Sequence, residues 1–300
     1  MRIKGNMWNY ALSRDKLTLV RQDSASKIGV VFSSGFFGFF AHAGFLAALR
    51  DRNIRSSGYA GASSGAIIAA MAASDMSDHT IREILLSLKK SDFWDPDPMP
   101  LILKEALKLF RGYSGYLRGK GFAHLLEHIP ITQIQDCPVP LVITATNLTF
   151  QREELFTRGS LIKGIQASGA VPILFKPVEI DGSLYVDGGM VNKAPVQALA
   201  DLIQPEKIIV HFIASDNLGG SSNSFLKKRM TPWHIHRLAV NISRHKAYQS
   251  QCGVIQQRGI ELIEVRTDTP GVDPNSLENG ISAYYKARET GIKILANKGF

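Results

Sequence analysis

"SGYAGASSGAIIAAMAAS" (residues 57–74) holds a G-x-S-x-G pattern, Gly61 to Gly65, between a short apolar run and an Ala-rich run. The run before the pattern predicts a strand, and the run after it predicts a helix. This strand–turn–helix context is typical of a nucleophile elbow, in which the two glycines let strand and helix approach closely. Ser63 is central, and its hydroxyl is expected at the helix N-terminus, where the dipole favours a developing oxyanion. Without the context the match would be weak, because small residues before an Ala-rich helix are common packing.

The preceding segment, "GVVFSSGFFGFFAHAGFLAAL" (29–49), carries no formal charge. A membrane-spanning helix needs about 20 predominantly apolar residues, so length alone admits a span here. The segment, however, changes from a strand-like run at 28–32 through Ser-Ser-Gly to a helix-like run at 41–49. This change of periodicity favours a buried strand–turn–helix over a membrane hairpin.

The rest of the chain predicts further strands and helices in alternation. We expect strands at 27–33, 139–150, 206–215 and 260–267, helices at 41–53, 77–93, 160–172 and 281–299, and a hairpin at 178–189. Such alternation predicts an α/β fold with three layers, α/β/α, around a mostly parallel central sheet. We expect one catalytic domain over 28–300, preceded by an N-terminal extension at 1–27.

The charge balance bears on partners. With 35 Lys+Arg against 26 Asp+Glu, the formal net charge is +9. This surplus favours contact with an anionic surface, or it forms a solvated basic face. No nucleic-acid-binding motif is present. The N-terminus lacks a signal-peptide pattern, and the two cysteines, Cys137 and Cys252, form no redox or metal motif, so the expected location is the cytoplasm.

A serine nucleophile needs a base within hydrogen-bond reach. His211 lies in an apolar run, which favours a core histidine with satisfied nitrogens. His124 and His128 share one helical face without the glutamate of a H-E-x-x-H site, which favours a solvated face. His234 and His236 belong to a basic segment that is typical of a surface loop.

Asp187 is a different kind of candidate. It ends the strand-like run "SLYV" and is followed by Gly188 and Gly189. Open α/β sheets place ligands and catalysts at the carboxyl ends of strands, so we expect the Asp187 carboxylate there. The alternative is an ordinary Asp-Gly turn.

With these residues in view, the chain resembles the patatin-like phospholipases of bacteria from about residue 28 to 295. The segments that carry the resemblance are "HAGFLAAL" (42–49), "GASSGAI" (61–67), "TATNLTF" (144–150) and "ASGAVPILFKPVEIDGSLYVDGGMVNKAPV" (167–196). The resemblance implies a Ser-Asp dyad, with Ser63 as nucleophile and Asp187 as base. It implies hydrolysis of acyl esters of lipids, or of small esters, through an acyl-enzyme and without a metal or other cofactor.

One segment departs from the family. The family's oxyanion loop is typically G-G-G-x-R-G, whereas residues 34–39 read Ser-Gly-Phe-Phe-Gly-Phe. Only Gly35 matches; Phe36 and Phe39 replace glycines, and Gly38 replaces the arginine. Backbone amides do not depend on side chains, so we expect those of Gly35 and Phe36, with that of Ser64, to form the oxyanion hole. A positive φ at Phe36 would be unfavourable.

Phe36, Phe37 and Phe39 are expected to line an acyl channel, and core packing is the alternative. The leading interpretation is therefore a serine acyl hydrolase of carboxylesterase, lipase or lysophospholipase type. Two alternatives remain open: a catalytically impaired lipid-binding protein, because of the altered loop, and a Ser-His-Asp esterase whose histidine comes from 211–245.

Two basic segments bear on membrane contact. Residues 101–113, "LILKEALKLFRGY", predict a basic amphipathic helix, and 226–237, "LKKRMTPWHIHR", form a tryptophan-bearing patch. Either would suit peripheral contact with anionic lipid or a lid. The alternative for residues 101–113 is an ordinary surface helix packed on the sheet.

Overall fold

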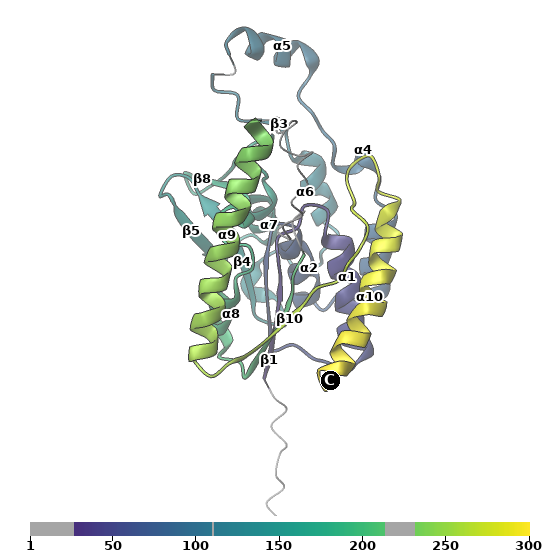
Figure 1. Cartoon of the computed structure of the whole chain (residues 1–300). Coiled ribbons are helices and arrows are strands. Elements are labelled where there is room, and N and C mark those ends of the chain that lie inside the picture. Colours follow the sequence, from purple (N-terminus) through teal and green to yellow (C-terminus); the bar gives the residue numbers. More distant parts are fainter. Residues whose placement is uncertain (1–26, 110, 214–231) are drawn as a thin grey trace, which may run out of the picture.

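The protein alternates strands and helices, as Figure 1 shows for this computed structural model, which describes residues 27–109, 111–213 and 232–300. The predicted extension at 1–27 therefore lies almost wholly outside the described residues. The strands are β1 Ile28–Phe32, β2 Gly58–Ala62, β3 Gly115–Leu117, β4 Leu141–Asn147, β5 Arg152–Phe156, β6 Ile173–Phe175, β7 Val178–Ile180, β8 Ser183–Val186, β9 Lys207–His211 and β10 Glu261–Val265. The helices are α1 Phe39–Asp51, α2 Ser64–Ala73, α3 Asp78–Leu86, α4 Lys90–Phe93, α5 Met99–Leu107, α6 Lys120–Leu126, α7 Leu161–Gly169, α8 Val196–Ile203, α9 Pro232–Gln257 and α10 Asn279–Asn297, with 3-10 turns η1 Ile134–Asp136 and η2 Gly188–Met190.

The central sheet is parallel over five strands and antiparallel at one edge. Its order is β10-β9-β1-β2-β4-β8-β7, with β5 paired to β4. The pairs from β10 to β4 are all parallel, whereas β8, β7 and β5 join in antiparallel fashion. The strands β3 and β6 form a separate two-stranded parallel sheet. The predicted mostly parallel sheet is confirmed.

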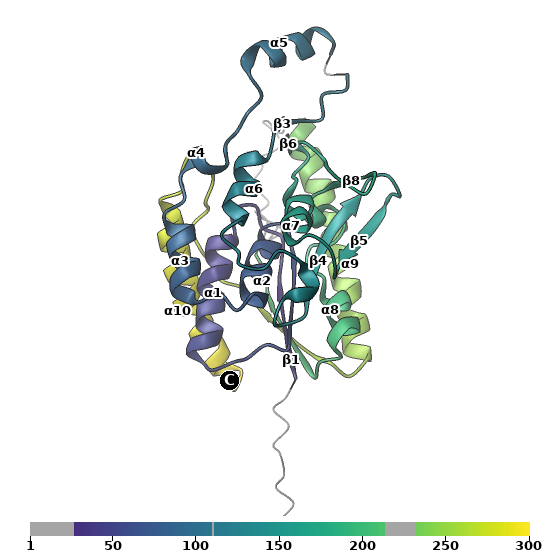
Figure 2. The ribbon, with the colours of Figure 1, turned by 180° about the vertical axis from the view of Figure 1, so that it is seen from behind.

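Helices cover both faces of this sheet, which confirms the three-layer α/β/α architecture (Figures 1 and 2). Successive residues of β1 show why: Val30 and Phe32 belong to the core under α1 and α2, and Val31 to the core under α8 and α9. A strand buried on both faces has no polar alternation, so β1 reads as a continuous apolar run.

The uncharged segment at 29–49 is internal to the fold. Helix α1 is buried from Phe39 to Leu49 and packs against α2, α3 and α10. Gly44 makes the contact with α10, because a Cβ on Gly44 would lie 2.0 Å from the carbonyl oxygen of Tyr284. No helix within the described ranges is long and apolar enough to cross a membrane.

Two expectations for the region after α2 are wrong. The helix predicted at 77–93 is two helices, because Leu88 turns into the core and the Asp92 carboxylate accepts the Lys89 amide to begin α4. The alternative for 101–113, a surface helix packed on the sheet, also fails, because α5 buries none of its residues and stands clear of the main body of the fold (Figure 1).

The α1–α10 contact generates a stability prediction. Gly44→Ala is expected to lower the free energy of unfolding by about 1–3 kcal/mol, because the new methyl group meets a backbone carbonyl that no rotamer change can move. Chemical denaturation monitored by circular dichroism measures the change.

Gly253→Ala is the matched control within α9. A Cβ there meets nothing within 4 Å, so the better helix propensity of alanine is expected to raise stability by up to about 1 kcal/mol. Equal effects of the two substitutions would contradict the close approach of α1 and α10.

Candidate functional site

Ser63 occupies a strained turn between β2 and α2. Its φ of 53° and ψ of −123° lie in a region that non-glycine residues rarely adopt, and it is the N-cap of α2. The flanking glycines make the turn sterically feasible: a Cβ on Gly61 would lie 2.3 Å from the carbonyl oxygen of Gly65. A Cβ on Gly65 would in turn lie 2.2 Å from the carbonyl oxygen of Phe32. Helix α2 therefore begins in direct backbone contact with β1 and β2.

Ser168, to which no sequence pattern pointed, holds this turn from α7. Its hydroxyl oxygen accepts a hydrogen bond from the backbone amide of Ser63 at 2.8 Å, and both residues are buried. An unpartnered buried amide would be costly, so this hydrogen bond stabilises the strained conformation. The sequence signal that could have identified Ser168 was its place in the segment 167–196, which carries part of the family resemblance.

Asp187 lies beside Ser63, although the strand that brings it there runs against the sheet. Strand β8 is antiparallel to β4, with Thr146 opposite Val186. Because β8 ends with that pair, at Val186, Asp187 meets the carboxyl edge of the parallel strands, where β2 ends at Ala62. Asp187 thus lies where we expected it. A short antiparallel strand places it there, whereas the expectation rested on parallel strands.

The two glycines after Asp187 are required by close contacts. A Cβ on Gly188 would lie 1.9 Å from the carbonyl oxygen of Thr144, and one on Gly189 would lie 2.5 Å from the Cβ of Ser34. The amide of Gly189 donates to Oδ1 of Asp187 at 2.7 Å. The backbone of Asp187 is held as well, since its amide donates to Ala170 and its carbonyl accepts the Thr146 hydroxyl.

Burial controls the electrostatics of Asp187, which is 5% exposed. Desolvation raises its pKa from 3.8 to about 6, opposed by hydrogen bonds from the Ser63 hydroxyl and the Gly189 amide and by the charge of Arg244. Arg244, on α9, also donates from Nη1 to the carbonyl of Gly189 at 3.0 Å. No sequence pattern pointed to Arg244, which comes from a helix far along the chain.

The loop at 34–39 forms a turn in which the amide of Gly38 donates to the carbonyl of Gly35 at 2.6 Å. Phe36 adopts a φ of 43°, the unfavourable conformation that the sequence analysis identified. Gly35 and Gly38 instead satisfy space requirements, because a Cβ on Gly35 would lie 2.8 Å from Ile213 and one on Gly38 would lie 2.7 Å from the Gly35 carbonyl oxygen.

The amides expected to form the oxyanion hole belong to two turns, the one at 34–39 and the one at Ser63. Within the part of the chain that the structure describes, the amides of Gly35, Phe36 and Ser64 donate to no protein acceptor. Phe36, Ser63 and Ser64 also line the same pocket. Three backbone donors therefore remain available in these two turns.

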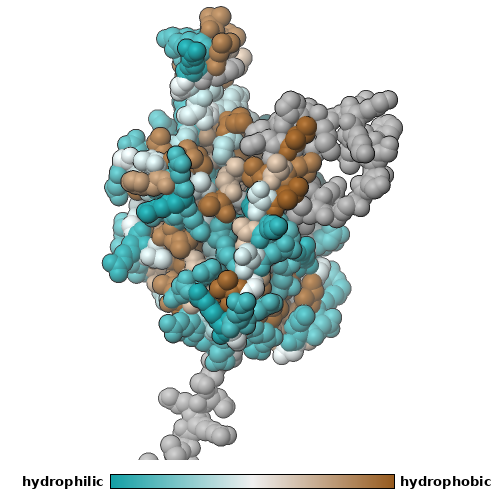
Figure 3. All heavy atoms as spheres, turned by 60° about the vertical axis from the view of Figure 1, so that its left-hand side comes forward, coloured by the Kyte–Doolittle hydropathy of each residue, from teal (hydrophilic) through white to brown (hydrophobic). Residues whose placement is uncertain are grey.

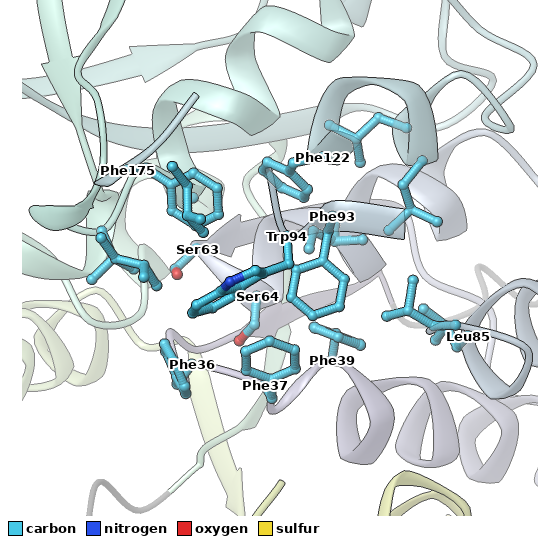
Figure 4. Close-up of a pocket in the computed structure, with 18 of the residues that line it drawn as sticks. Phe36, Phe37, Phe39, Ser63, Ser64, Leu85, Phe93, Trp94, Phe122 and Phe175 are labelled. Carbon is cyan, nitrogen blue, oxygen red and sulfur yellow. The ribbon is translucent and has the colours of Figure 1, made fainter. Parts of the chain in front are cut away.

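This pocket is an apolar cavity of about 70 Å³ that opens to solvent. Figure 4 shows Ser63 at one end and Leu85 at the other, with aromatic rings between them. Phe36, Phe37 and Phe39 all line it, and Phe37 packs 5.4 Å from both Phe39 and Phe93 between ring centroids. Apart from Ser63 and Ser64, the side chains of its wall are apolar or aromatic.

The histidines His42 and His211 lie together in the core. His211 is buried, with its Nδ1 2.7 Å from Nδ1 of His42 and its Nε2 2.9 Å from the Thr267 hydroxyl. His42 in turn donates from Nε2 to the Ser33 carbonyl, so its Nδ1 accepts a hydrogen bond from the Nδ1–H of His211. Burial lowers the pKa of His42 to about 3 and that of His211 well below 6.5. His211 is a core histidine, as predicted.

The other histidines considered from the sequence are His124, His128, His234 and His236. His124 is exposed and lies 2.9 Å from the carboxylate of Glu127, and its ring centroid is 6.5 Å from that of His128. The side chains of His234 and His236, and most of the basic patch at 226–237, lie outside the described residues.

The sequence profile described as patatin-like phospholipase matches residues 30–200. An uncharacterized NTE family protein of Mycobacterium tuberculosis is 28% identical over 183 residues, covering 60% of this chain and 48% of that protein. Lysophospholipase NTE1 of Cryptococcus neoformans is 26% identical over 190 residues, covering 62% of this chain and 11% of that protein. The chain thus matches about half of the mycobacterial relative and a small part of the fungal one.

Among solved structures, VipD from Legionella pneumophila has a similar fold. The superposition has a TM-score of 0.50 and 16% sequence identity and covers 91% of this chain and 67% of VipD. At this identity the similarity concerns the fold alone.

The buried carboxyl generates a prediction of how stability depends on pH. Since the folded-state pKa of Asp187 is about 6, above the value of about 3.9 in unfolded chains, folding becomes less favourable as pH rises through this interval. Asp187→Asn removes the buried charge and retains an oxygen for the Gly189 amide. It is expected to raise the free energy of unfolding at pH 8 by up to about 3 kcal/mol, with no gain at pH 4.

Urea denaturation at the two pH values measures the difference between variant and wild type. Asp181→Asn, in the exposed β7–β8 turn, is the matched control and is expected to show no such pH dependence. Equal effects of Asp187→Asn at pH 4 and pH 8 would contradict a desolvated carboxyl.

Proposed function

The chain belongs to the patatin-like phospholipase family, and on that premise we propose that it is a serine acyl hydrolase cleaving fatty-acyl esters of lipids. The observation that carries the proposal is the strained Ser63, hydrogen-bonded to the buried Asp187 at one end of an apolar pocket. We propose that one catalytic domain over residues 28–300 carries this activity.

Acylation would begin with attack of Ser63 Oγ on the ester carbonyl carbon, as the hydroxyl proton passes to the Asp187 carboxylate. Negative charge then develops on the carbonyl oxygen, where the amides of Gly35, Phe36 and Ser64 are proposed to stabilise it. Collapse of the tetrahedral intermediate breaks the ester bond. The departing alkoxide takes the proton from Asp187, and the acyl group remains on Ser63.

Deacylation would reverse these roles with water. Asp187 takes a proton from the attacking water, and the second tetrahedral intermediate collapses to release the fatty acid as the proton returns to Ser63. A pKa of about 6 makes Asp187 a stronger base than an aspartate in water while leaving it mostly ionised at neutral pH. No histidine and no metal is needed for either half-reaction.

The pocket supports the proposed substrate class. A wall of aromatic and aliphatic side chains that leads away from Ser63 suits a fatty-acyl chain and offers little to a polar acyl group. The name of the fungal relative, a lysophospholipase, points to the same class of substrate. With a net charge of +9, peripheral contact with anionic membranes in the cytoplasm is part of this proposal.

Hydrolysis of p-nitrophenyl esters with acyl chains of increasing length tests the reaction. Ser63→Ala and Asp187→Ala are each expected to lower kcat/KM by about 1,000-fold or more, because members of a catalytic unit act together. Ser64→Ala is the matched control, since its proposed role resides in its backbone amide. Wild-type kcat/KM is expected to fall as pH decreases through about 6, where Asp187 takes up a proton.

Covalent labelling by a fluorophosphonate separates this proposal from its alternatives. Labelling that Ser63→Ala abolishes and Ser64→Ala preserves is expected. An unlabelled, inactive wild type would instead indicate a lipid-binding protein impaired by the altered loop at 34–39. Loss of activity on substitution of His234, His236 or His245 would indicate a Ser-His-Asp esterase.

The far end of the pocket is expected to set the acyl length. Leu85 is 2% exposed and lies across the pocket from Ser63 (Figure 4). Leu85→Phe should shorten the channel and move the preferred p-nitrophenyl ester toward shorter chains, while turnover of the butyrate remains within about threefold of wild type. An unchanged chain-length profile would contradict an acyl site in this pocket.

A further inference from the structure

Helix α5 carries an apolar stripe that the rest of the described chain does not cover. Met99, Leu103 and Leu107 follow one another at four-residue spacing and are 63%, 62% and 88% exposed. Leu109, just beyond the helix, is 83% exposed. An amphipathic helix of a globular protein normally turns such a stripe toward the core, whereas α5 presents it to the outside.

Basic side chains lie next to this stripe. Lys104 and Lys108 follow one another at four-residue spacing, and Arg111 follows the helix. Figure 3 shows hydrophobic and hydrophilic atoms on different sides of the projecting part of the molecule. From Met99 to Lys120 the only acidic residue is Glu105, whose carboxylate lies 3.0 Å from the Lys108 ammonium group.

The segments that hold α5 lead directly to the apolar pocket. Before the helix, Trp94 lines the pocket, and Pro96 forms a β-bridge with Leu117. After it, β3 ends at Leu117, which also lines the pocket. The exposed Phe36 and the residues that follow Ile173, which is 63% exposed, complete this side of the pocket. Helix α5 and the pocket therefore share one end of the molecule.

We infer that α5 is a docking helix for an anionic phospholipid bilayer. The helix inserts its leucines among the acyl chains of the lipids and so brings the pocket against the membrane. Leucines beside lysines on one short helix match the apolar interior and the anionic headgroups of such a bilayer at once. This inference names the surface that delivers substrate to the proposed active site, and in that sense it rests on the proposed function.

A second copy of the chain is a poorer fit to this surface. A helix of nine residues is about 14 Å long and about 10 Å across. One face of it offers far less than the roughly 800 Å² per partner that a stable protein interface buries. The adjacent positive charges would also repel the same surface of another copy, whereas anionic headgroups attract them.

Flotation with vesicles of phosphatidylcholine containing phosphatidylserine, and with vesicles of phosphatidylcholine alone, measures docking of the full chain. The apolar variant is Leu103→Gln, Leu107→Gln and Leu109→Gln together. The charge variant is Lys104→Gln, Lys108→Gln and Arg111→Gln together. The matched controls on other elements are Leu148→Gln, Leu184→Gln and Leu202→Gln together, and Arg258→Gln, Lys286→Gln and Lys293→Gln together.

The charge variant is expected to bind anionic vesicles on the order of 100-fold more weakly, at about fivefold per basic residue. The apolar variant is expected to lose at least about tenfold, since each leucine forfeits burial in the acyl region. Both controls should bind within about threefold of wild type, and high salt should weaken wild-type binding. All variants should hydrolyse p-nitrophenyl butyrate like wild type and unfold at the same temperature, because the changed side chains are exposed.

Binding by either α5 variant that matches its control would overturn the docking role, as would equal binding of wild type to neutral and anionic vesicles. Faster or slower butyrate hydrolysis with unchanged vesicle binding would show α5 to be a lid. A change of mass in sedimentation equilibrium with unchanged vesicle binding would indicate a second copy. If the wild type hydrolyses no ester yet binds vesicles through α5, the proposed function is wrong and the docking role stands.

Discussion

The backbone contact between the start of α2 and strand β1 is the constraint on which the rest of the site depends. Gly65 has no Cβ, and one would lie 2.2 Å from the Phe32 carbonyl oxygen. Because the helix begins this close to the sheet, Ser63 is held at a φ of 53° between a strand and a helix that cannot separate. Its amide then reaches Ser168 and its hydroxyl reaches Asp187. A bulkier residue at Gly61 or Gly65 would displace all of these groups together.

Burial of Asp187 makes its carboxylate more basic and makes the folded protein less stable at neutral pH. The desolvated carboxyl is least stable when charged, which is the state that its proposed role as general base requires at neutral pH. Hydrogen bonds from Ser63 and Gly189 and the charge of Arg244 recover part of that loss. The strained Phe36, with a φ of 43°, lines the same pocket as Ser63. Strained backbone and buried charge thus concentrate within one region of a well-packed fold.

Much of this could be predicted from local sequence, and the misses have physical reasons. The turn at Asp181 and Gly182 and the strand–turn–helix around Ser63 depend on residues that are neighbours in the chain, so the local sequence pattern was enough to predict them. Asp187 was singled out correctly as a neighbour of the turn, but by a rule for parallel strands, whereas β8 is antiparallel. Strand direction is a property of pairing between distant segments. Arg244 and Ser168 reach the site only through packing, which no local pattern encodes.

The sequence by itself determined the layered fold, the glycine-flanked Ser63, the turn that holds Asp187 and the core position of His211, because spacing and periodicity along the chain specify each of them. It also showed that α5 would be amphipathic and basic. Only the tertiary structure decided that the apolar stripe of α5 faces outward, since a stripe on a helix specifies a face and not what covers it. The structure likewise decided that Asp187 is desolvated beside Ser63, because burial arises from contacts among β2, β8, α7 and α9 that meet only when the chain is folded.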